Sequence, residues 1–341
     1  MIGMVQRLWF HSKVFFNRHL VGSLAYYIAR FKSPNAYHFK QYFIPNRYDH
    51  EQTAQRVLVY FPRSSSPNTN NHSSNIYINI HPGGFVSGYP EDCSEFCDLV
   101  AQELNCIVVA PQYGLAPEYP FPKGLYDCLN AVEWSLQEFG NEQNPRLTKL
   151  AVGGFSAGGN LAFGLAQLIV SKNIPLECLI SFYPPMNFTS QSKSTFQTTN
   201  PLKRCVYYEA YLQAIIERVE CEMLSQEEIE KLLQDPLLSP SYASIEMLPR
   251  SVMLIAAQYD PNIADMEQFM NTMRIRYEEL ENNRLNHTQN SRPYRFYGEV
   301  YERVFHGWNF IPEFLLRKDG TQKKWHAYQQ ALDELERVFK I

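Results

Sequence analysis

Acidic residues are missing from the first 48 positions of this 341-residue chain, whose first aspartate is Asp49. The same stretch carries basic side chains throughout, together with apolar ones that include the aromatics Trp9, Phe10, Phe15 and Phe16. A secretory signal needs an uninterrupted apolar core, and lysine, arginine and histidine interrupt this one. That excludes a secretory signal and leaves three interpretations: a cap over a ligand site, a membrane-surface contact or a cleaved organelle address.

Long apolar runs are missing as well. None approaches the roughly 20 residues that a membrane-spanning helix needs. The formal net charge is only −4, so the composition lacks the basic excess that nucleic-acid binding requires. We therefore expect no nucleic-acid partner. Peripheral membrane contact through the N-terminal segment stays open as an alternative, and so does a homodimer.

Paired cysteines are the third absence. The chain has seven cysteines, and Cys93 and Cys97 stand four apart without the Cys-x-x-Cys spacing or neighbouring histidines of a zinc site. We expect no metal and no cofactor. We also expect the thiols to be buried within the protein and the protein to lie in a reducing compartment, the cytoplasm. Location at a membrane surface or in an organelle is the alternative that the basic N-terminus raises.

The chain does contain a regular alternation of strand and helix patterns. Hydrophobic residues make up 45% of it and aromatic residues 14%, enough for a sizeable core. Strands that alternate with helices predict an α/β protein with a mostly parallel central sheet flanked by helices. Strands are expected over 56–61, 75–80, 106–113, 149–155, 176–183, 251–260 and 293–306, and helices over 92–105, 125–140, 160–170, 263–280 and 323–339.

The alternation stops between about 187 and 236, where the sequence becomes polar and helical. We predict that this insert and residues 1–50 form a helical cap over the carboxyl edge of the sheet, where the sites of such sheets lie. The N-terminal aromatics would then supply apolar surface to the cap. Residues 51–186 and 237–341 would be the first and second parts of the α/β domain.

The stretch "GGFSAGGN" (153–160) crowds glycines around one serine. It lies where a predicted strand meets a predicted helix, and Gly154, Ser156 and Gly158 have the spacing of a nucleophile elbow. Small flanking residues let the backbone turn sharply enough to present the hydroxyl. A phosphate loop would need a Lys-Ser/Thr pair and a dinucleotide fingerprint would need Gly-x-Gly-x-x-Gly, and the stretch has neither.

A serine needs a base to take its proton and a third group to hold that base. In the chain order of such elbows the acid and then the histidine follow the serine. Among the later histidines, His306 ends a predicted strand, whereas His287 lies in a polar loop and His326 on an amphipathic helix. The acid candidates are Asp260 at a strand end, Asp265 on the next helix and Asp235 in the insert, and a strand-end aspartate can equally be a helix N-cap.

An oxyanion requires preorganised backbone N–H donors. "HPGGF" (81–85) follows a predicted strand and offers Gly83 and Gly84, where no side chain would block the approach of a substrate. The third donor would be the N–H of Ala157. An ordinary turn is the alternative interpretation of this motif.

Taken together, these motifs resemble the hormone-sensitive-lipase-like esterases of the α/β-hydrolase fold. "HPGGF" resembles that family's His-Gly-Gly-Gly motif, "GFSAGGNLA" (154–162) its nucleophile motif and "YGLAPEYPFP" (113–122) its Tyr-Arg-Leu-Ala-Pro-Glu-His-Pro-Phe-Pro signature. The weaker "DPNIAD" (260–265) and "FHGW" (305–308) stand where the family has its acid and base motifs. The resemblance runs from about residue 56 to the end.

The resemblance implies a triad of Ser156, Asp260 and His306, and an oxyanion hole of Gly83, Gly84 and Ala157 that His81 braces. Three positions depart from the family pattern: Pro82 replaces the first glycine, Gly114 stands where the family usually has arginine, and Phe155 where many members have Asp or Thr. Pro82 has no N–H to donate, but the two donating glycines remain.

The resemblance implies a serine hydrolase that cleaves carboxylic esters of small to medium acyl chains through an acyl-enzyme, with a small-molecule ester as its partner. The alternatives are a deacetylase of sterol esters or amides and a non-catalytic small-molecule-binding protein on the same fold.

Overall fold

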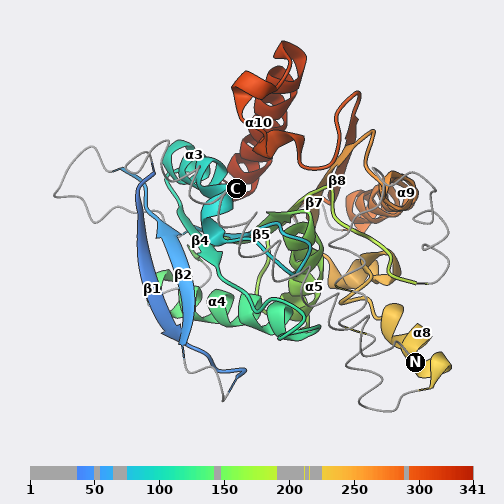
Figure 1. Cartoon of the computed structure of the whole chain (residues 1–341). Coiled ribbons are helices and arrows are strands. Elements are labelled where there is room, and N and C mark those ends of the chain that lie inside the picture. The colour runs from blue at the N-terminus through green and yellow to red at the C-terminus, as the bar shows by residue number, and fades with distance from the viewer. Residues whose placement is uncertain are drawn as a thin grey trace.

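The computed structural model describes residues 37–49, 54–63, 75–141, 147–189, 211, 215, 225–287 and 292–340. They contain an eight-stranded sheet in the order β1-β2-β4-β3-β5-β6-β7-β8 (Figure 1). The first two pairings are antiparallel and all others are parallel. The strands are β1 (Phe39–Pro45), β2 (Ala54–Tyr60), β3 (Ile76–Ile80), β4 (Ile107–Pro111), β5 (Leu150–Phe155), β6 (Cys178–Phe182), β7 (Ser251–Ala257) and β8 (Arg295–Tyr301). The predicted mostly parallel α/β sheet is therefore confirmed.

The central strands are continuous buried runs, because helices cover both faces of the sheet. Every residue of β3, β4, β5, β6 and β7 is buried. The long helices are α3 (Ser94–Leu104), α4 (Lys123–Phe139), α5 (Ala157–Ser171), α9 (Ile263–His287) and α10 (Lys318–Lys340).

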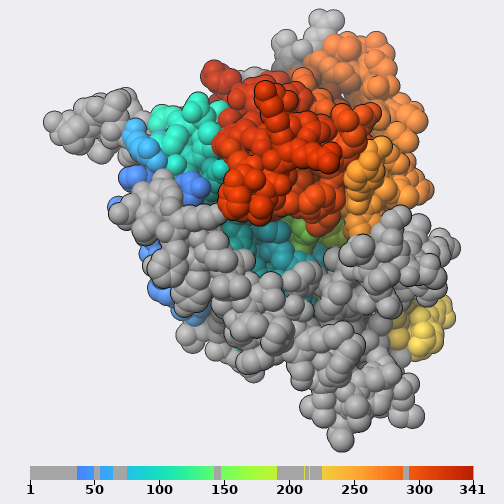
Figure 2. Space-filling view, turned by 45° about the horizontal axis from the view of Figure 1, so that its top comes forward, coloured from blue at the N-terminus to red at the C-terminus, as the bar shows by residue number. Residues whose placement is uncertain are grey.

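The helices form two groups. Helix α3 packs against α10, and the rings of Phe96 and Tyr328 lie 4.9 Å apart between them. Helix α4 packs against α5, and α5 meets α9 through Phe163 and Phe269, whose ring centroids are 5.4 Å apart. Figure 2 shows α10 (red) above teal and green segments from the middle of the chain.

One boundary of the predicted domains needs correction. The sequence predicts that residues 1–50 belong to the cap, but Phe39–Pro45 form β1, an edge strand paired with β2 from Phe39↔Tyr60 to Pro45↔Ala54. Most β1 side chains are exposed and only Ile44 is buried. The strand therefore lacks the apolar alternation by which strands are recognised in a sequence. Residues 1–36, with Trp9, Phe10, Phe15 and Phe16, lie outside the described residues.

Within the predicted cap insert, the structure describes residues 187–189, 211, 215 and 225–236. Helix α8 (Gln226–Leu233) lies near the C-terminal end of the insert. It begins with a capping box, in which the Ser225 side chain accepts from the N–H of Glu228. Tyr211 and Ile215 are buried, and the ring of Tyr211 stacks on Phe85 with centroids 4.0 Å apart. Residues 190–210, 212–214 and 216–224 lie outside the described residues. No helix in the described ranges is long and apolar enough to cross a membrane.

Candidate active site

Ser156 lies between the last residue of β5 and the first of α5, in a backbone conformation rare for a side-chain-bearing residue. Its φ is 54° and its ψ is −118°. The Ser156 N–H donates to the carbonyl of Phe182 over 2.8 Å, and its carbonyl accepts from the N–H of Asn160 over 3.0 Å. Such strain persists only where the surroundings enforce it and is common at functional sites.

The glycines around Ser156 are required by close backbone approach. A β-carbon on Gly154 would lie 2.6 Å from the backbone of Gly158, and one on Gly158 would lie 2.1 Å from the carbonyl oxygen of Ile80. The predicted spacing of glycines thus lets β5 turn sharply into α5 while the start of α5 packs against the end of β3.

The structure brings the predicted acid, base and nucleophile into one hydrogen-bonded series. The hydroxyl of Ser156 lies 2.7 Å from Nε2 of His306, and Nδ1 of His306 lies 2.5 Å from Oδ2 of Asp260. The other carboxylate oxygen of Asp260 accepts from the N–H of Asn262 over 2.8 Å. The side chain of Asp260 is fully buried, whereas 32% of the His306 side chain is exposed. A buried carboxylate thus holds an imidazole that is partly exposed.

The other candidates lie elsewhere. Asp265 is in the first turn of α9, and Asp235 caps its own loop by accepting from the N–H of Leu237. His287 is the last residue of α9, and Nδ1 of His326 lies 2.7 Å from the Tyr301 hydroxyl. Among the described residues, no three His, Cys, Asp or Glu side chains form a group that could hold a metal ion.

The glycine loop after β3 has a left-handed backbone at both of its glycines. The φ angle is 131° at Gly83 and 60° at Gly84, and a β-carbon on Gly83 would lie 1.9 Å from the carbonyl oxygen of Ser87. The carbonyl of Gly83 accepts from the N–H groups of Val86 and Ser87, which fixes the turn. Ala157 is the first residue of α5, where N–H groups have no partner within the helix.

His81 lies beneath this loop. Its Nδ1 is 2.7 Å from the carbonyl oxygen of Pro82, and its ring stacks on Tyr113 with centroids 4.2 Å apart. Burial lowers the pKa of His81 to about 4, so the ring is neutral near pH 7. A β-carbon on Gly88 would lie 2.8 Å from Nδ1, which shows how closely the loop wraps the imidazole.

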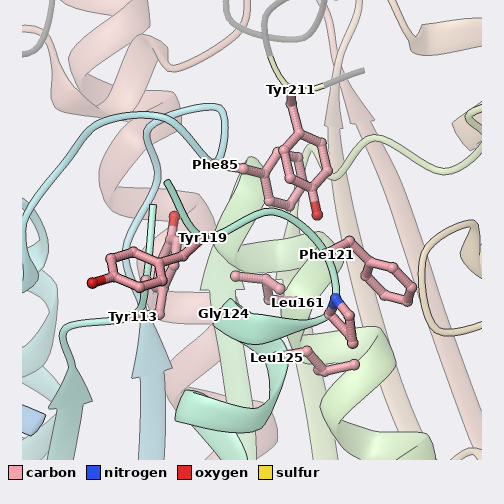
Figure 3. Close-up of a pocket in the computed structure, with 10 residues that line it drawn as sticks. Phe85, Tyr113, Tyr119, Phe121, Gly124, Leu125, Leu161 and Tyr211 are labelled. Atoms are coloured by element: carbon pink, nitrogen blue, oxygen red, sulfur yellow. The ribbon is translucent and has the colours of Figure 1, made fainter. Parts of the chain in front are cut away.

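A pocket adjoins the glycine loop (Figure 3). It is small and partly open to solvent, and its lining includes Phe85, Tyr119, Phe121, Leu161 and Tyr211. Figure 3 shows the rings of Phe85 and Tyr211 face to face at one end of the pocket. Phe85 directly follows Gly84, and Leu161 lies five residues beyond Ser156 on α5.

Two of the three departures from the family pattern have a structural explanation. Gly114 lines this pocket, where a β-carbon would lie 2.9 Å from the β-carbon of Tyr119. Phe155 is buried in an aromatic cluster, stacked on Phe182 with centroids 4.4 Å apart. Both substitutions therefore alter packing.

Phe182, which ends β6, and the following Tyr183 contact the predicted nucleophile and base, but sequence patterns did not identify them. The Phe182 carbonyl accepts from Ser156, and the next residue, Tyr183, lies 4.7 Å from His306 between ring centroids. The available signal was topological: β6 is parallel to β5, so its carboxyl end reaches the same edge of the sheet.

Comparison with known proteins agrees with this architecture. A family profile described as "alpha/beta hydrolase fold" matches residues 77–288. An arylesterase of Saccharolobus solfataricus is 30% identical over 206 residues, which span 60% of this chain and 62% of that protein. Human hormone-sensitive lipase is 32% identical over 138 residues, which span 39% of this chain and 12% of the lipase.

A solved structure of a Pyrobaculum calidifontis esterase superposes with a TM-score of 0.70 at 22% identity, covering 95% of this chain and 92% of that one. At that identity the superposition supports the fold alone. Since the profile match spans more than half of the sequence, the chain belongs to the hormone-sensitive-lipase-like family of α/β-hydrolase-fold proteins.

Proposed function

We propose that the protein is a serine hydrolase of carboxylic esters, with Ser156 as nucleophile, His306 as general base and Asp260 as the acid that orients it. The observation that carries the proposal is the hydrogen-bonded series from Ser156 Oγ through the two nitrogens of His306 to Asp260 Oδ2. Relatives named arylesterase, carboxylesterase and hormone-sensitive lipase support the same reaction class.

The reaction then has two halves. Ser156 Oγ attacks the ester carbonyl carbon while His306 Nε2 takes its proton, and the tetrahedral intermediate expels the alcohol, which receives that proton. Water next attacks the acyl-serine with His306 again as base, and collapse releases the carboxylic acid and restores the Ser156 hydroxyl. Asp260 keeps the proton on Nδ1, so Nε2 is free to accept.

The negative charge on the carbonyl oxygen would be stabilised by the N–H groups of Gly83, Gly84 and Ala157. Two features support this role: the left-handed turn at the two glycines and the position of Ala157 at the start of α5. Removing one such donor typically costs about 2.7–4 kcal/mol of transition-state stabilisation. The neutral ring of His81 under the loop would brace it and would not act as a base.

The acyl group is proposed to be small to medium in length. The pocket beside Phe85 is small, and the stacked rings of Phe85 and Tyr211 lie at one end of it. Its lining is mainly aromatic and aliphatic, as an acyl chain requires.

A reducing compartment such as the cytoplasm is proposed from the thiols. The cysteines that the structure describes are buried and free, and burial raises the pKa of the Cys106 thiol to about 12. Such thiols are protonated and unreactive at neutral pH.

The proposed function is tested by hydrolysis of p-nitrophenyl acetate, butyrate and longer esters by the purified protein and its Ser156→Ala variant. Wild type should turn over the short esters and the variant should not. Equal rates for the two proteins would overturn the proposal.

A further inference from the structure

Tyr183 contacts His306 of the proposed triad, although it is not itself a member of the triad. It directly follows β6, is fully buried, and has a φ of 38°, an unusual value for a residue with a side chain. Its N–H donates to the carbonyl of Ile255 on β7 over 2.6 Å. The strand that leads to Asp260 thus holds this strained residue in place.

The dipeptide Phe182–Tyr183 touches both the nucleophile and the base. The Phe182 carbonyl accepts from the N–H of Ser156 over 2.8 Å. The ring of Tyr183 meets the imidazole of His306 with centroids 4.7 Å apart and planes at 60°. One rigid segment of backbone therefore sets where the hydroxyl of Ser156 and the ring of His306 stand relative to each other.

Tyr183 also holds the loop on which His306 is carried. Its hydroxyl donates to the side-chain carbonyl of Asn309, and its ring lies 5.4 Å from that of Trp308. The side-chain amide of Asn309 in turn donates to the hydroxyl of Tyr328 on α10 over 3.2 Å. Three of the four residues from His306 to Asn309 thus contact Tyr183.

We propose that Tyr183 is a positioning residue, whose ring restricts the rotation of the His306 imidazole and keeps Nε2 within hydrogen-bonding distance of the Ser156 hydroxyl. The inference rests on the proposed function, because it takes His306 as the base. A catalytic group misplaced by about 1 Å can lose roughly 10²-fold in rate. Loss of the ring should therefore lower kcat while binding is retained.

The test compares Tyr183→Leu with Tyr183→Phe and with a matched control, Tyr277→Leu. Tyr277 is 2% exposed, and its hydroxyl donates to the carbonyl of Pro249, away from the triad. Tyr183→Leu should lower kcat by roughly 10–10²-fold with KM nearly unchanged. Tyr183→Phe keeps the ring and should recover most of that loss, and Tyr277→Leu should keep wild-type kcat.

A second readout does not depend on turnover. The proton between His306 Nδ1 and Asp260 should give a low-field proton resonance in wild type and Tyr183→Phe, weakened or absent in Tyr183→Leu. If wild type hydrolyses no ester, and the resonance is present in wild type and Tyr183→Phe but lost in Tyr183→Leu, the proposed function fails while the placement of the imidazole by Tyr183 stands.

The inference is overturned if Tyr183→Leu matches Tyr277→Leu in kcat and keeps the resonance, or if Tyr183→Phe loses as much kcat as Tyr183→Leu. Should the leucine variant not fold, Tyr183→Met fills similar volume with a flexible side chain and carries the same expectations.

Discussion

The carbonyl oxygen of Ile80, at the end of β3, faces the α-carbon of Gly158 so closely that an added β-carbon would lie 2.1 Å away. Because backbone atoms stand on both sides of this contact, Gly158→Ala must displace either α5 or β3. We expect it to destabilise the protein by roughly 1–3 kcal/mol and to lower kcat, since α5 begins at the nucleophile. Chemical denaturation and ester hydrolysis measure the two effects.

A matched glycine lies in α10. A β-carbon on Gly320 would have its nearest contact at 3.4 Å, an ordinary packing distance. Gly320→Ala should be neutral or stabilising by up to about 1 kcal/mol, because alanine favours a helix. If Gly158→Ala were as harmless as Gly320→Ala, the close crossing at the elbow would be wrong.

Variants of Asp260 and Asp265 distinguish an aspartate that orients the base from one that stabilises the first turn of a helix. Asp260→Asn should lower kcat strongly, because an amide supports the wrong tautomer of His306, and the corresponding change in the serine-protease template costs about 10⁴-fold. Asp265 stands in the first turn of α9, so Asp265→Asn should cost only roughly 0.3–1 kcal/mol of stability. Steady-state kinetics of both variants decide the assignment, and the reverse pattern would move the acid to Asp265.

His81 gives the fold a predictable dependence on pH. Burial lowers its pKa from 6.5 to about 4, so the folded state resists a protonation that the unfolded chain accepts. The stability that its neutral form provides is therefore complete above pH 6.5 and is lost as the pH falls toward 4. The loss is on the order of 3 kcal/mol from the size of the pKa shift.

The check on His81 is a denaturation series from pH 7.5 to 4 on wild type and His81→Phe. Phenylalanine keeps a ring against Tyr113 but cannot be protonated. The free energy of unfolding of wild type should fall relative to that of His81→Phe as the pH falls through this window. A constant difference between the two proteins across the series would refute the buried neutral imidazole.

Tyr211 should limit the length of the acyl chain. Its ring lies against Phe85 at one end of the pocket, so Tyr211→Ala would widen that end. Relative to butyrate, we expect kcat/KM for octanoate esters to rise by roughly 10-fold. Tyr242→Ala, at an exposed position outside the pocket lining, is the control. An unchanged chain-length profile in Tyr211→Ala would place the acyl chain elsewhere.

Much of the fold could be predicted because the parallel strands are buried on both faces. Runs such as "IVVAP" (107–111) and "SVMLIAA" (251–257) carry their apolar signal in every residue, and helices α3 and α4 have a helical apolar periodicity. Strand β1 was not predicted, because an edge strand with one buried residue lacks a continuous apolar run. The shift of the N-terminal domain boundary follows from that one strand.

The elements of the candidate site could be predicted to different degrees. Ser156, Asp260 and His306 each end or follow a predicted strand, and parallel strands gather their carboxyl ends at one edge. Tyr183 shares that location, but a tyrosine before two prolines has no chemical signature of its own. Its contact with His306 depends on the path of the loop after β8, which local sequence patterns do not encode.

The central claim is that Ser156 is the nucleophile of an ester hydrolase. The most direct test is to treat the protein with a fluorophosphonate and locate the covalent adduct by peptide mass spectrometry. The account predicts one adduct, on the peptide that contains Ser156, formed rapidly in wild type, slowly in His306→Ala and not at all in Ser156→Ala. An adduct on a different residue, or wild-type protein that hydrolyses esters while Ser156 stays unmodified, would contradict it.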